Sequence, residues 1–218
     1  MSAIRAVYGA SGCGRGVMPL VRAQLEHRFS ATGELVFVDD RESRIQVNGH
    51  RVLRYEQFVA LPRVDKRIVL AIADGRIRER LAVRCAADGA GFLEARAANV
   101  VIMDDVEIGE GAVLCPFVTV TSNVRIGRHF HANLYSYVEH DCVIGDFVTF
   151  APGVKCNGNV VIEDYAYIGA GAVLRQGRPG APLVVGRGAT VGMGAVVTRS
   201  VPPMSTVVGN PARPLEKR

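Results

Sequence analysis

The sequence predicts an α/β N-terminal part with a small parallel sheet, followed by a parallel β-helix built of hexapeptide repeats. Two observations lead to this prediction. Strand-like and helix-like segments alternate in roughly the first 95 residues. From residue 102 to residue 174, every sixth position is apolar or small. No α-helix or flat sheet repeats on six residues, whereas three hexapeptides make one coil of a parallel β-helix.

The N-terminal elements follow one another in an alternating order. We expect strands at residues 4–8, 34–38 and 67–72, a helix that ends near residue 28, and a second helix over residues 76–88. A glycine-rich turn at residues 9–14 links the first strand to the first helix, and the pair Asp39-Asp40 closes the second strand. This order predicts a small parallel sheet of the Rossmann-like kind. We place the domain boundary at residue 96, giving domains 1–96 and 97–218.

The hexapeptide segment contains two inward registers. The first runs from Ile102 to Leu174, and the second lies four residues later in each repeat, with small or β-branched residues from Val106 to Ala172. The phase breaks at residues 175–183 and resumes in a shifted register at Val185. This predicts a loop ejected from the wall, which either covers a ligand groove or is a tolerated insertion. Two arginines in the loop favour the first interpretation.

The glycine-rich turn between the first strand and helix favours a bound phosphate. Gly9, Gly12 and Gly14 leave backbone N–H groups and the positive end of the helix facing any ligand there. A full dinucleotide domain needs two such halves and this segment supplies one, so an NAD-dependent dehydrogenase is disfavoured. The alternative is that the glycines serve only a tight turn.

His140 is the strongest candidate for catalysis. It lies two residues after the inward Val138, so its side chain is expected to project from the wall, and Glu139 and Asp141 flank it. Carboxylates raise the basicity of an imidazole, which a general base requires. Gly158 is one coil later, directly above His140, where backbone N–H groups could face a developing oxyanion. The alternative is an ordinary surface histidine.

Two other histidines in the repeat receive no catalytic role. His129 and His131 are at offsets three and five of the repeat, and we expect them to face solvent or a neighbouring subunit. The five cysteines contain no C-x-x-C pair, and Cys142 and Cys156 fall on inward positions. We therefore expect no disulfide and no metal site.

Composition excludes several classes of protein. The net charge is +5, but the arginines form no dense cluster with interleaved aromatic residues, which disfavours nucleic-acid binding. Scattered arginines suit ligands that carry phosphate equally well. The chain has no apolar run of membrane-spanning length and no signal-peptide layout at its start. A cytoplasmic location is expected.

Together these motifs resemble those of bacterial sugar-nucleotide acetyltransferases of the left-handed β-helix type. The closest resemblance is to the UDP-4-amino-sugar N-acetyltransferases of the bacillosamine pathway, and sialic-acid O-acetyltransferases are related. The resemblance covers nearly the whole chain and rests on residues 8–14 (YGASGCG), 38–40 (VDD), 138–145 (VEHDCVIG), 153–159 (GVKCNGN) and 208–213 (VGNPAR).

The resemblance implies a homotrimer in which the N-terminal domain binds a nucleotide-activated amino sugar and acetyl-CoA lies between neighbouring β-helices. His140 then matches the general base and Asp141 its acidic neighbour. The implied substrate contacts are Ser11, Gly12, Cys13, Asp39, Asp40 and Asp74, and the implied acetyl-CoA contacts are Thr149, Gly158, Ala170 and Met193.

Two positions depart from the family pattern, and both lie on the acceptor side. Cys13 stands where many relatives carry histidine, and Ala73-Asp74 replaces a glycine-asparagine pair. The activity expected is direct transfer of an acetyl group to the amine of the sugar. Alternatives are O-acetylation of a sugar hydroxyl, as in sialic acid or a polysaccharide precursor, a covalent route through Cys13, or a non-catalytic nucleotide-sugar-binding β-helix.

Overall fold

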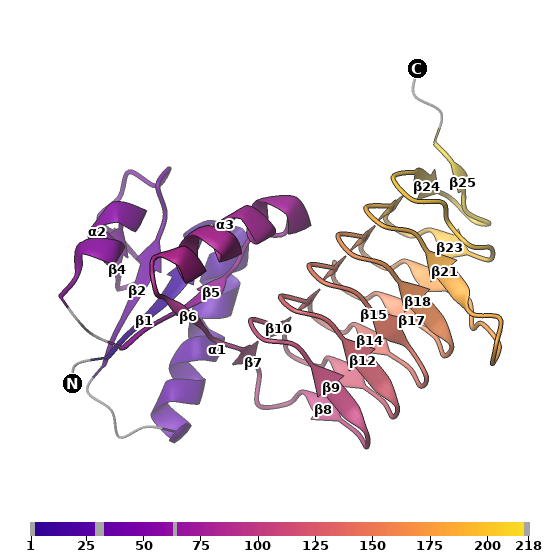
Figure 1. Cartoon of the computed structure of the whole chain (residues 1–218), viewed down its shortest axis with the longest axis horizontal. Coiled ribbons are helices and arrows are strands. Elements are labelled where there is room, and N and C mark those ends of the chain that lie inside the picture. The colour runs from indigo at the N-terminus through magenta and orange to yellow at the C-terminus, as the bar shows by residue number, and fades with distance from the viewer. Residues whose placement is uncertain (1–2, 29–32, 63–64, 216–218) are drawn as a thin grey trace.

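The N-terminal part of the computed structural model is a six-stranded sheet with three helices (Figure 1). The structure describes residues 3–28, 33–62 and 65–215. The strand order is β3-β4-β2-β1-β5-β6. The elements are β1 (Ala3–Tyr8), α1 (Gly12–Arg28), β2 (Gly33–Val38), β3 (Gln46–Val47), β4 (His50–Leu53), α2 (Tyr55–Ala60), β5 (Asp65–Leu70), α3 (Gly75–Ala87) and β6 (Gly91–Phe92).

The central strands confirm the expected parallel sheet. β1 pairs in parallel with β2 and β5, so Tyr8, Val38 and Leu70 end at one edge. β5 ends at Leu70, two residues before the expected end, because the next carbonyls turn away from the sheet: those of Ile72 and Ala73 accept hydrogen bonds from a buried arginine of α3.

Four elements of this part had no counterpart in our expectations. The strands β3 and β4 form an antiparallel hairpin, and α2 and β6 complete the sheet region. The hairpin turns at Asn48 and Gly49, both with positive φ. An Asn-Gly pair is the usual sequence signal for such a turn, so this hairpin was readable from the sequence.

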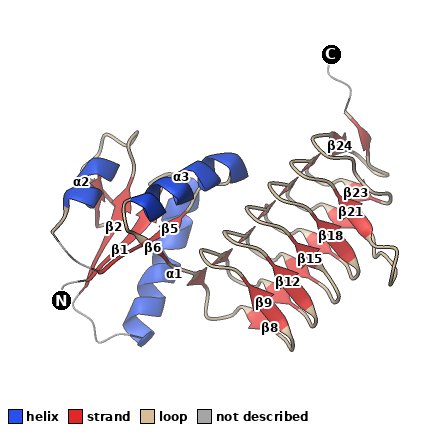
Figure 2. Ribbon diagram, viewed as in Figure 1, coloured by secondary structure: helices blue, strands red, loops and turns tan. Residues whose placement is uncertain are grey.

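The rest of the chain is a parallel β-helix with three walls of stacked strands (Figure 2). The first wall contains β7 (Ala95–Arg96), β10 (Val113–Leu114), β13 (His131–Ala132), β16 (Thr149–Phe150), β19 (Tyr167–Ile168), β22 (Thr190–Val191) and β24 (Thr206–Val208), with β25 (Arg213–Pro214) antiparallel at its end. The second contains β8 (Val101–Ile102), β11 (Thr119–Val120), β14 (Tyr137–Val138), β17 (Lys155–Cys156), β20 (Val173–Leu174) and β23 (Val196–Val197). The third contains β9 (Val106–Ile108), β12 (Val124–Ile126), β15 (Val143–Ile144), β18 (Val160–Ile162) and β21 (Leu183–Val185).

The two expected inward registers form the core of the β-helix. From Leu114 to Leu174 the first register is buried throughout, as is the second from Ala112 to Ala172. The one polar side chain in these stretches, Ser136, donates to the carbonyl of Ala151 at 3.0 Å and accepts from the N–H of Val154. Its burial therefore leaves no hydroxyl group unpaired.

The ejected loop is also present. Leu183 pairs with Val160, 23 residues along the chain instead of the 18 of a regular coil. The surplus residues turn outward near a bridge between Arg178 and Ala181, and the N–H of Gly177 donates to the carbonyl of Gly158 at 2.9 Å. The loop thus stands on the coil directly above His140.

A buried arginine joins the two parts of the chain. Arg78 of α3 is 0% exposed, and its guanidinium donates across the junction to the carbonyls of His129 and Val148 and to the hydroxyl of Thr149. Burial lowers the pKa of Arg78 to about 9, so it remains a cation at neutral pH. Near it, Gly75 leaves no room for a Cβ against the carbonyl oxygen of Phe147.

His129 and His131 correct our expectation, because both are buried, at 1% and 2% exposure. His129 stacks on Phe147 and meets Phe92 edge-on, so the N-terminal part covers this corner of the β-helix. Burial lowers the pKa of His129 to about 4 and also lowers that of His131. The repeat distinguishes inward from outward positions and contains no information on what covers the outside.

Candidate active site

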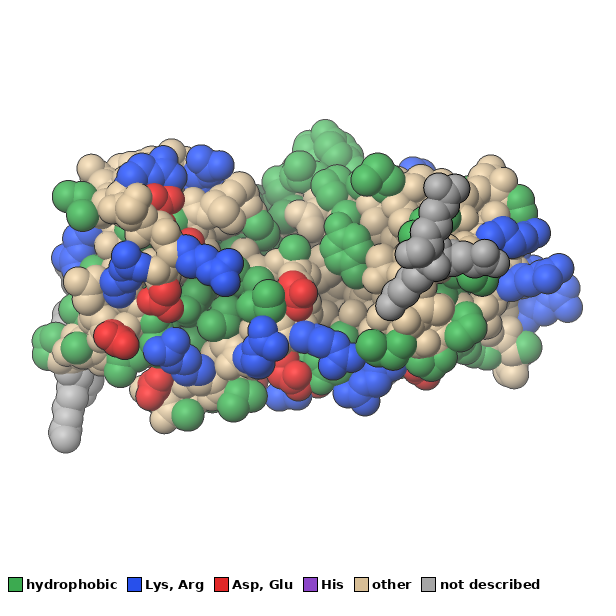
Figure 3. Space-filling view, turned by 90° about the horizontal axis from the view of Figure 1, so that it is seen from above, with side chains coloured by type: hydrophobic (Ala, Val, Ile, Leu, Met, Phe, Trp, Pro, Cys, Tyr) green, Lys and Arg blue, Asp and Glu red, His purple; other side chains and the backbone are tan. Residues whose placement is uncertain are grey.

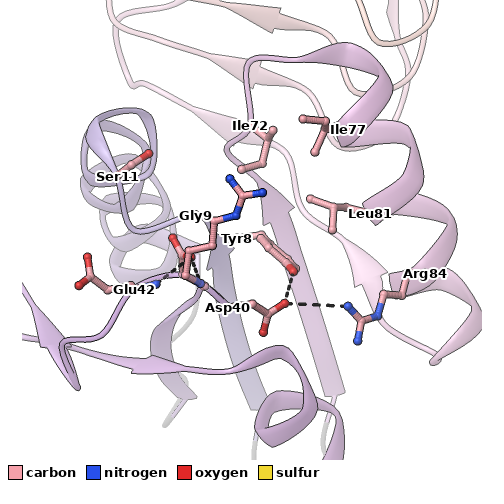
Figure 4. A pocket seen from close by; sticks show the side chains of 11 residues that line it. Tyr8, Gly9, Ser11, Asp40, Glu42, Ile72, Ile77, Leu81 and Arg84 are labelled. Carbon is pink, nitrogen blue, oxygen red and sulfur yellow. Dashed lines mark hydrogen bonds and ion pairs between the residues drawn. The ribbon is translucent and has the colours of Figure 1, made fainter.

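A cavity of about 590 Å³ lies at the carboxyl edge of the N-terminal sheet, between the glycine-rich turn and α3 (Figure 4). Figure 4 shows Ser11 on the α1 side and Ile77, Leu81 and Arg84 along α3 on the other. An open cavity beyond the carboxyl ends of parallel strands is the usual ligand position in such sheets.

The two aspartates expected to contact substrate line this cavity and also build it. Asp39 accepts hydrogen bonds from the backbone N–H groups of Ala10, Arg41 and Glu42 at 2.8, 2.9 and 3.2 Å, which ties the glycine-rich turn to the end of β2. The hydrogen bonds of Asp39 are thus already directed at the protein's own backbone.

Asp40 holds Tyr8 and Tyr55 in place at another side of the cavity. It accepts from the Tyr8 hydroxyl at 2.9 Å and from the Tyr55 N–H at 2.8 Å, and it lies 3.9 Å from Arg84. Burial and this hydrogen bond raise the pKa of Tyr8, so its hydroxyl stays protonated. Arg84 covers the Tyr55 ring at 3.9 Å and presents a cation to the cavity. The sequence-based prediction missed Tyr8 and Arg84, although Tyr8 is the last residue of a buried strand.

The other N-terminal candidates lie behind or beside this cavity. Ser11 lines it, whereas Gly12, Cys13 and Asp74 do not. A Cβ on Gly14 would clash with the carbonyl of Gly9, which explains that glycine as part of the tight turn. Burial raises the pKa of the Cys13 thiol, which opposes its use as an acyl-carrying nucleophile.

His140 projects from the corner between the second and third walls and is held by Asp141. Its Nδ1 lies 2.7 Å from Asp141 Oδ2, and Asn123 Nδ2 donates to the other oxygen of that carboxylate at 3.3 Å. The hydrogen bond to Asp141 raises the pKa of His140, and the pKa of Asp141 is lowered by the same pairing. With Nδ1 engaged, Nε2 is the nitrogen free to accept a proton.

Gly158 provides the space for the His140 ring. A Cβ placed on Gly158 would lie 2.5 Å from both Nε2 and Cε1 of His140. Within the described residues, the Gly158 N–H donates to no backbone carbonyl, although its own carbonyl accepts from Gly177. A residue with a free N–H packed against an imidazole with a free nitrogen is the kind of arrangement that can supply an oxyanion donor and a general base.

The three remaining candidates for acetyl-CoA binding lie away from His140. Thr149 is on the first wall, where its hydroxyl accepts from Arg78 at 3.0 Å and donates to the carbonyl of Ala73 at 2.8 Å. Ala170 and Met193 are on the turns that follow β19 and β22, and Met193 is 82% exposed. The turns beside them contain Gly171 and Gly194, beyond which a Cβ would meet open space. This corner therefore offers bare backbone to a ligand.

A single chain keeps the N-terminal cavity and His140 apart. Among the residues described, no hydrogen bond or ion pair links residues 139–142 or 157–159 to the sheet and helices of residues 3–92. The two sites lie on different sides of the β-helix, because the N-terminal part covers the corner between the third and first walls.

Metal and membrane features are not found in the parts of the chain described. Residues 3–28, 33–62 and 65–215 contain no group of three or more metal-ligating side chains, and all five cysteines are free. In the same ranges, no helix has the length and apolar character needed to cross a membrane.

Comparison with known proteins places the chain in a family. Residues 141–176 match the family described as bacterial transferase hexapeptide (six repeats). GDP-perosamine N-acetyltransferase of Escherichia coli O157:H7 is 49% identical over 97% of this chain and 96% of its own length. The chain belongs to the hexapeptide-repeat sugar-nucleotide acetyltransferases.

Two solved structures of this family share the architecture. WeeI from Acinetobacter baumannii AYE is 55% identical, with a TM-score of 0.94 over 99% of this chain and 100% of its own. The acetyltransferase domain of PglB from Neisseria gonorrhoeae FA1090, in complex with acetyl coenzyme A, is 31% identical, with a TM-score of 0.86 over 99% and 100% of the two chains. The likeness therefore includes both the N-terminal sheet and the β-helix.

The space above His140 can be tested with Gly158→Ala. The added methyl would displace the imidazole. A catalytic group displaced by about 1 Å lowers turnover by on the order of ten- to a hundredfold. Steady-state acetyl transfer measures the effect, with Gly16→Ala, whose Cβ meets open space, as the control. Normal turnover by a folded Gly158→Ala enzyme would contradict the assigned position of the ring.

The role of Asp141 can be tested with Asp141→Asn. Because Asp141 raises the pKa of His140, its loss lowers that pKa. A general base works only when deprotonated, so the acidic limb of the kcat/KM profile should move to lower pH while turnover at neutral pH falls. Asp105→Asn, two coils earlier on the same corner and paired with Arg125, is the control. An acidic limb that stays in place would show that Asp141 does not tune the base.

Proposed function

We propose that the chain transfers the acetyl group of acetyl-CoA to the amino group of a nucleotide-linked amino sugar, with His140 as general base. The observation that carries this proposal is the His140 pair: Nδ1 is held by Asp141, and the imidazole edge with the free Nε2 packs against Gly158, whose N–H has no backbone acceptor among the described residues. Membership of the acetyltransferase family and the 49% identical relative that acts on GDP-perosamine support the substrate classes.

The proposed chemistry is a direct transfer. The sugar amine attacks the thioester carbonyl, His140 Nε2 takes the proton from the attacking nitrogen, and the N–H of Gly158 donates to the oxyanion. The carbon–sulfur bond then breaks, and the imidazolium returns its proton to the CoA thiolate. The amide and CoA leave, and His140 is neutral again.

A GDP-linked amino sugar is the acceptor that we propose first. The support is the E. coli relative, which matches nearly the whole of both chains. The cavity of the N-terminal sheet supplies the expected features of a nucleotide site, because Arg84 and the start of α1 face it with positive charge and Ile77 and Leu81 offer apolar contact.

We also propose a homotrimer of left-handed β-helices, with domains 1–96 and 97–218, in which two subunits complete each active site. The support is the separation of the N-terminal cavity from His140 within one chain. Apolar side chains are gathered at the surface over the middle of the molecule (Figure 3), and the exposed set includes Phe117 stacked on Tyr135 at 4.7 Å. Exposed apolar side chains in contact with one another are typical of a subunit interface.

The test is release of CoA from acetyl-CoA in the presence of GDP-, UDP- and dTDP-linked 4-amino sugars and of sialic acid. We expect turnover with the GDP-linked amino sugar and at least a roughly hundredfold loss in His140→Ala. The variant should melt at the wild-type temperature and still bind acetyl-CoA. Near-normal turnover in His140→Ala would exclude its role as base, and turnover of sialic acid alone would replace N-acetylation by O-acetylation.

A further inference from the structure

Two buried cysteines lie in the β-helix core directly behind the corner that carries His140. Cys142 and Cys156 are both 0% exposed, and both are free thiols. Their sulfur atoms approach the same main-chain oxygen: Cys142 Sγ lies 3.3 Å and Cys156 Sγ 3.9 Å from the carbonyl oxygen of Asn157. The proposed chemistry gives neither thiol a role.

The carbonyl of Asn157 points into the core. The two thiols that reach it are fully buried, and no backbone N–H of the described residues donates to it. A carbonyl that is buried without a hydrogen-bond donor lowers the stability of the fold. An S–H group is a weak donor, and the thiol of Cys142, the nearer of the two, supplies the hydrogen bond that this carbonyl needs.

The peptide bond between Asn157 and Gly158 turns this inward contact into an outward N–H. The bond is trans, because the one cis bond among the residues described precedes Pro211. In a planar trans peptide the C=O and N–H groups point in opposite directions. With the carbonyl held in the core, the Gly158 N–H points away from the core, on the surface from which His140 projects. This N–H is the donor that the proposed chemistry assigns to the oxyanion.

Glycine makes this peptide easy to rotate. Residue 158 must be a glycine, because a Cβ there would lie 2.5 Å from the imidazole of His140. A residue without a Cβ has the widest range of backbone conformations, so the peptide before it can turn over and direct its carbonyl outward. An outward carbonyl would repel an oxyanion. The hydrogen bond from Cys142 opposes that rotation.

Cysteine interrupts a column of valines at this coil. The equivalent positions in the two preceding coils and in the next one are Val106, Val124 and Val160. Valine has no hydrogen-bond donor in its side chain, so a donor occurs in this column only behind the peptide that precedes Gly158. The cysteine sulfur also accepts the N–H of Val160 at 3.4 Å. One side chain thus contacts the backbone of two successive coils.

The chain itself shows that a hydroxyl can make the same contacts. Ser136, at the preceding corner, donates to the carbonyl of Ala151, fifteen residues later, at 3.0 Å. It accepts the N–H of Val154, eighteen residues later, at 3.2 Å. Cys142 makes its two contacts at the same separations of fifteen and eighteen residues. Serine at position 142 should therefore preserve the hydrogen bond.

We propose that Cys142 is a positioning residue for acetyl transfer, whose thiol holds the Asn157 carbonyl inward and so keeps the Gly158 N–H directed at the oxyanion. A hydrogen bond to the carbonyl also polarises the peptide and strengthens its N–H as a donor. The inference rests on the proposed function and adds to it a group from the core. Cys142 touches neither substrate and takes part in no covalent step.

The inference predicts that Cys142→Val lowers kcat by about tenfold or more and leaves both KM values unchanged. Loss of an oxyanion donor lowers kcat by about 10²–10³, and a donor that is misdirected for part of the time loses a share of that effect. The variant should fold, because valine occupies the equivalent position in the adjacent coils. Cys142→Ser should recover most of the lost turnover, and Cys156→Val is the matched control that should change kcat little.

Crystal structures of the two Cys142 variants provide a measurement that does not depend on turnover. The Asn157 carbonyl should leave its inward position in Cys142→Val and keep it in Cys142→Ser. An inward carbonyl with unchanged kcat in the valine variant would overturn the inference, as would equal losses of kcat and melting temperature in both variants. A wild-type enzyme that acetylates no acceptor, with the carbonyl released only in the valine variant, would contradict the proposed activity and leave the positioning contact standing.

Discussion

The arrangement of the molecule depends on one buried cation. Arg78 has no exposed surface and no carboxylate partner among the residues described, and its guanidinium is satisfied by main-chain carbonyls and one hydroxyl from both parts of the chain. A buried charge is tolerated only when its hydrogen bonds are complete, so the two parts must dock in one relative position. Gly75 permits the close approach, and the neutral histidines His129 and His131 pack beside the cation without adding charge. The docking turns the start of α3 toward the first wall and so creates a small cavity lined by Asp74 and Thr149.

The repeat imposes a second constraint, on the position of His140, the proposed base. Each eighteen-residue coil places equivalent residues one above another, so Gly158 necessarily lies over His140 and Asn123 lies beneath Asp141. The corner that carries His140 is fixed by this register, and the corner that the N-terminal part covers is fixed by Arg78. Because these are different corners, one chain does not bring the N-terminal cavity and the proposed base together. In the proposed trimer a neighbouring copy supplies the missing half, which also explains why bare glycine turns and exposed apolar side chains occur on the β-helix surface.

The sequence predicted most of the fold, because a period of six is compatible with few structures and the N-terminal elements alternate clearly. It also predicted the stacking of Gly158 on His140, since this follows from the coil length alone. The sequence-based prediction was wrong or incomplete where a residue's surroundings depend on contact between the N-terminal part and the β-helix. His129 and His131 occupy outward positions of the repeat, yet both are buried, and Phe92 of β6 meets the His129 ring edge-on. Asp39 and Asp40 were expected to contact substrate, and the structure shows both accepting hydrogen bonds from the backbone that forms the cavity. No pattern in the sequence predicted the small cavity, because its lining residues come from segments far apart in the sequence.

The most direct test of a shared active site is a mixed trimer in which each subunit type has one damaged half-site. His140→Ala removes the proposed base, and Leu81→Trp fills the cavity that Leu81 lines and that we propose for the nucleotide. Each variant alone should be inactive. If the site is shared between subunits, every trimer purified through tags on both variants contains one intact site, and activity returns to about one third of the wild-type value. Mixed trimers that stay as inactive as their parents would show that nucleotide and base act within one chain, and would contradict the shared site.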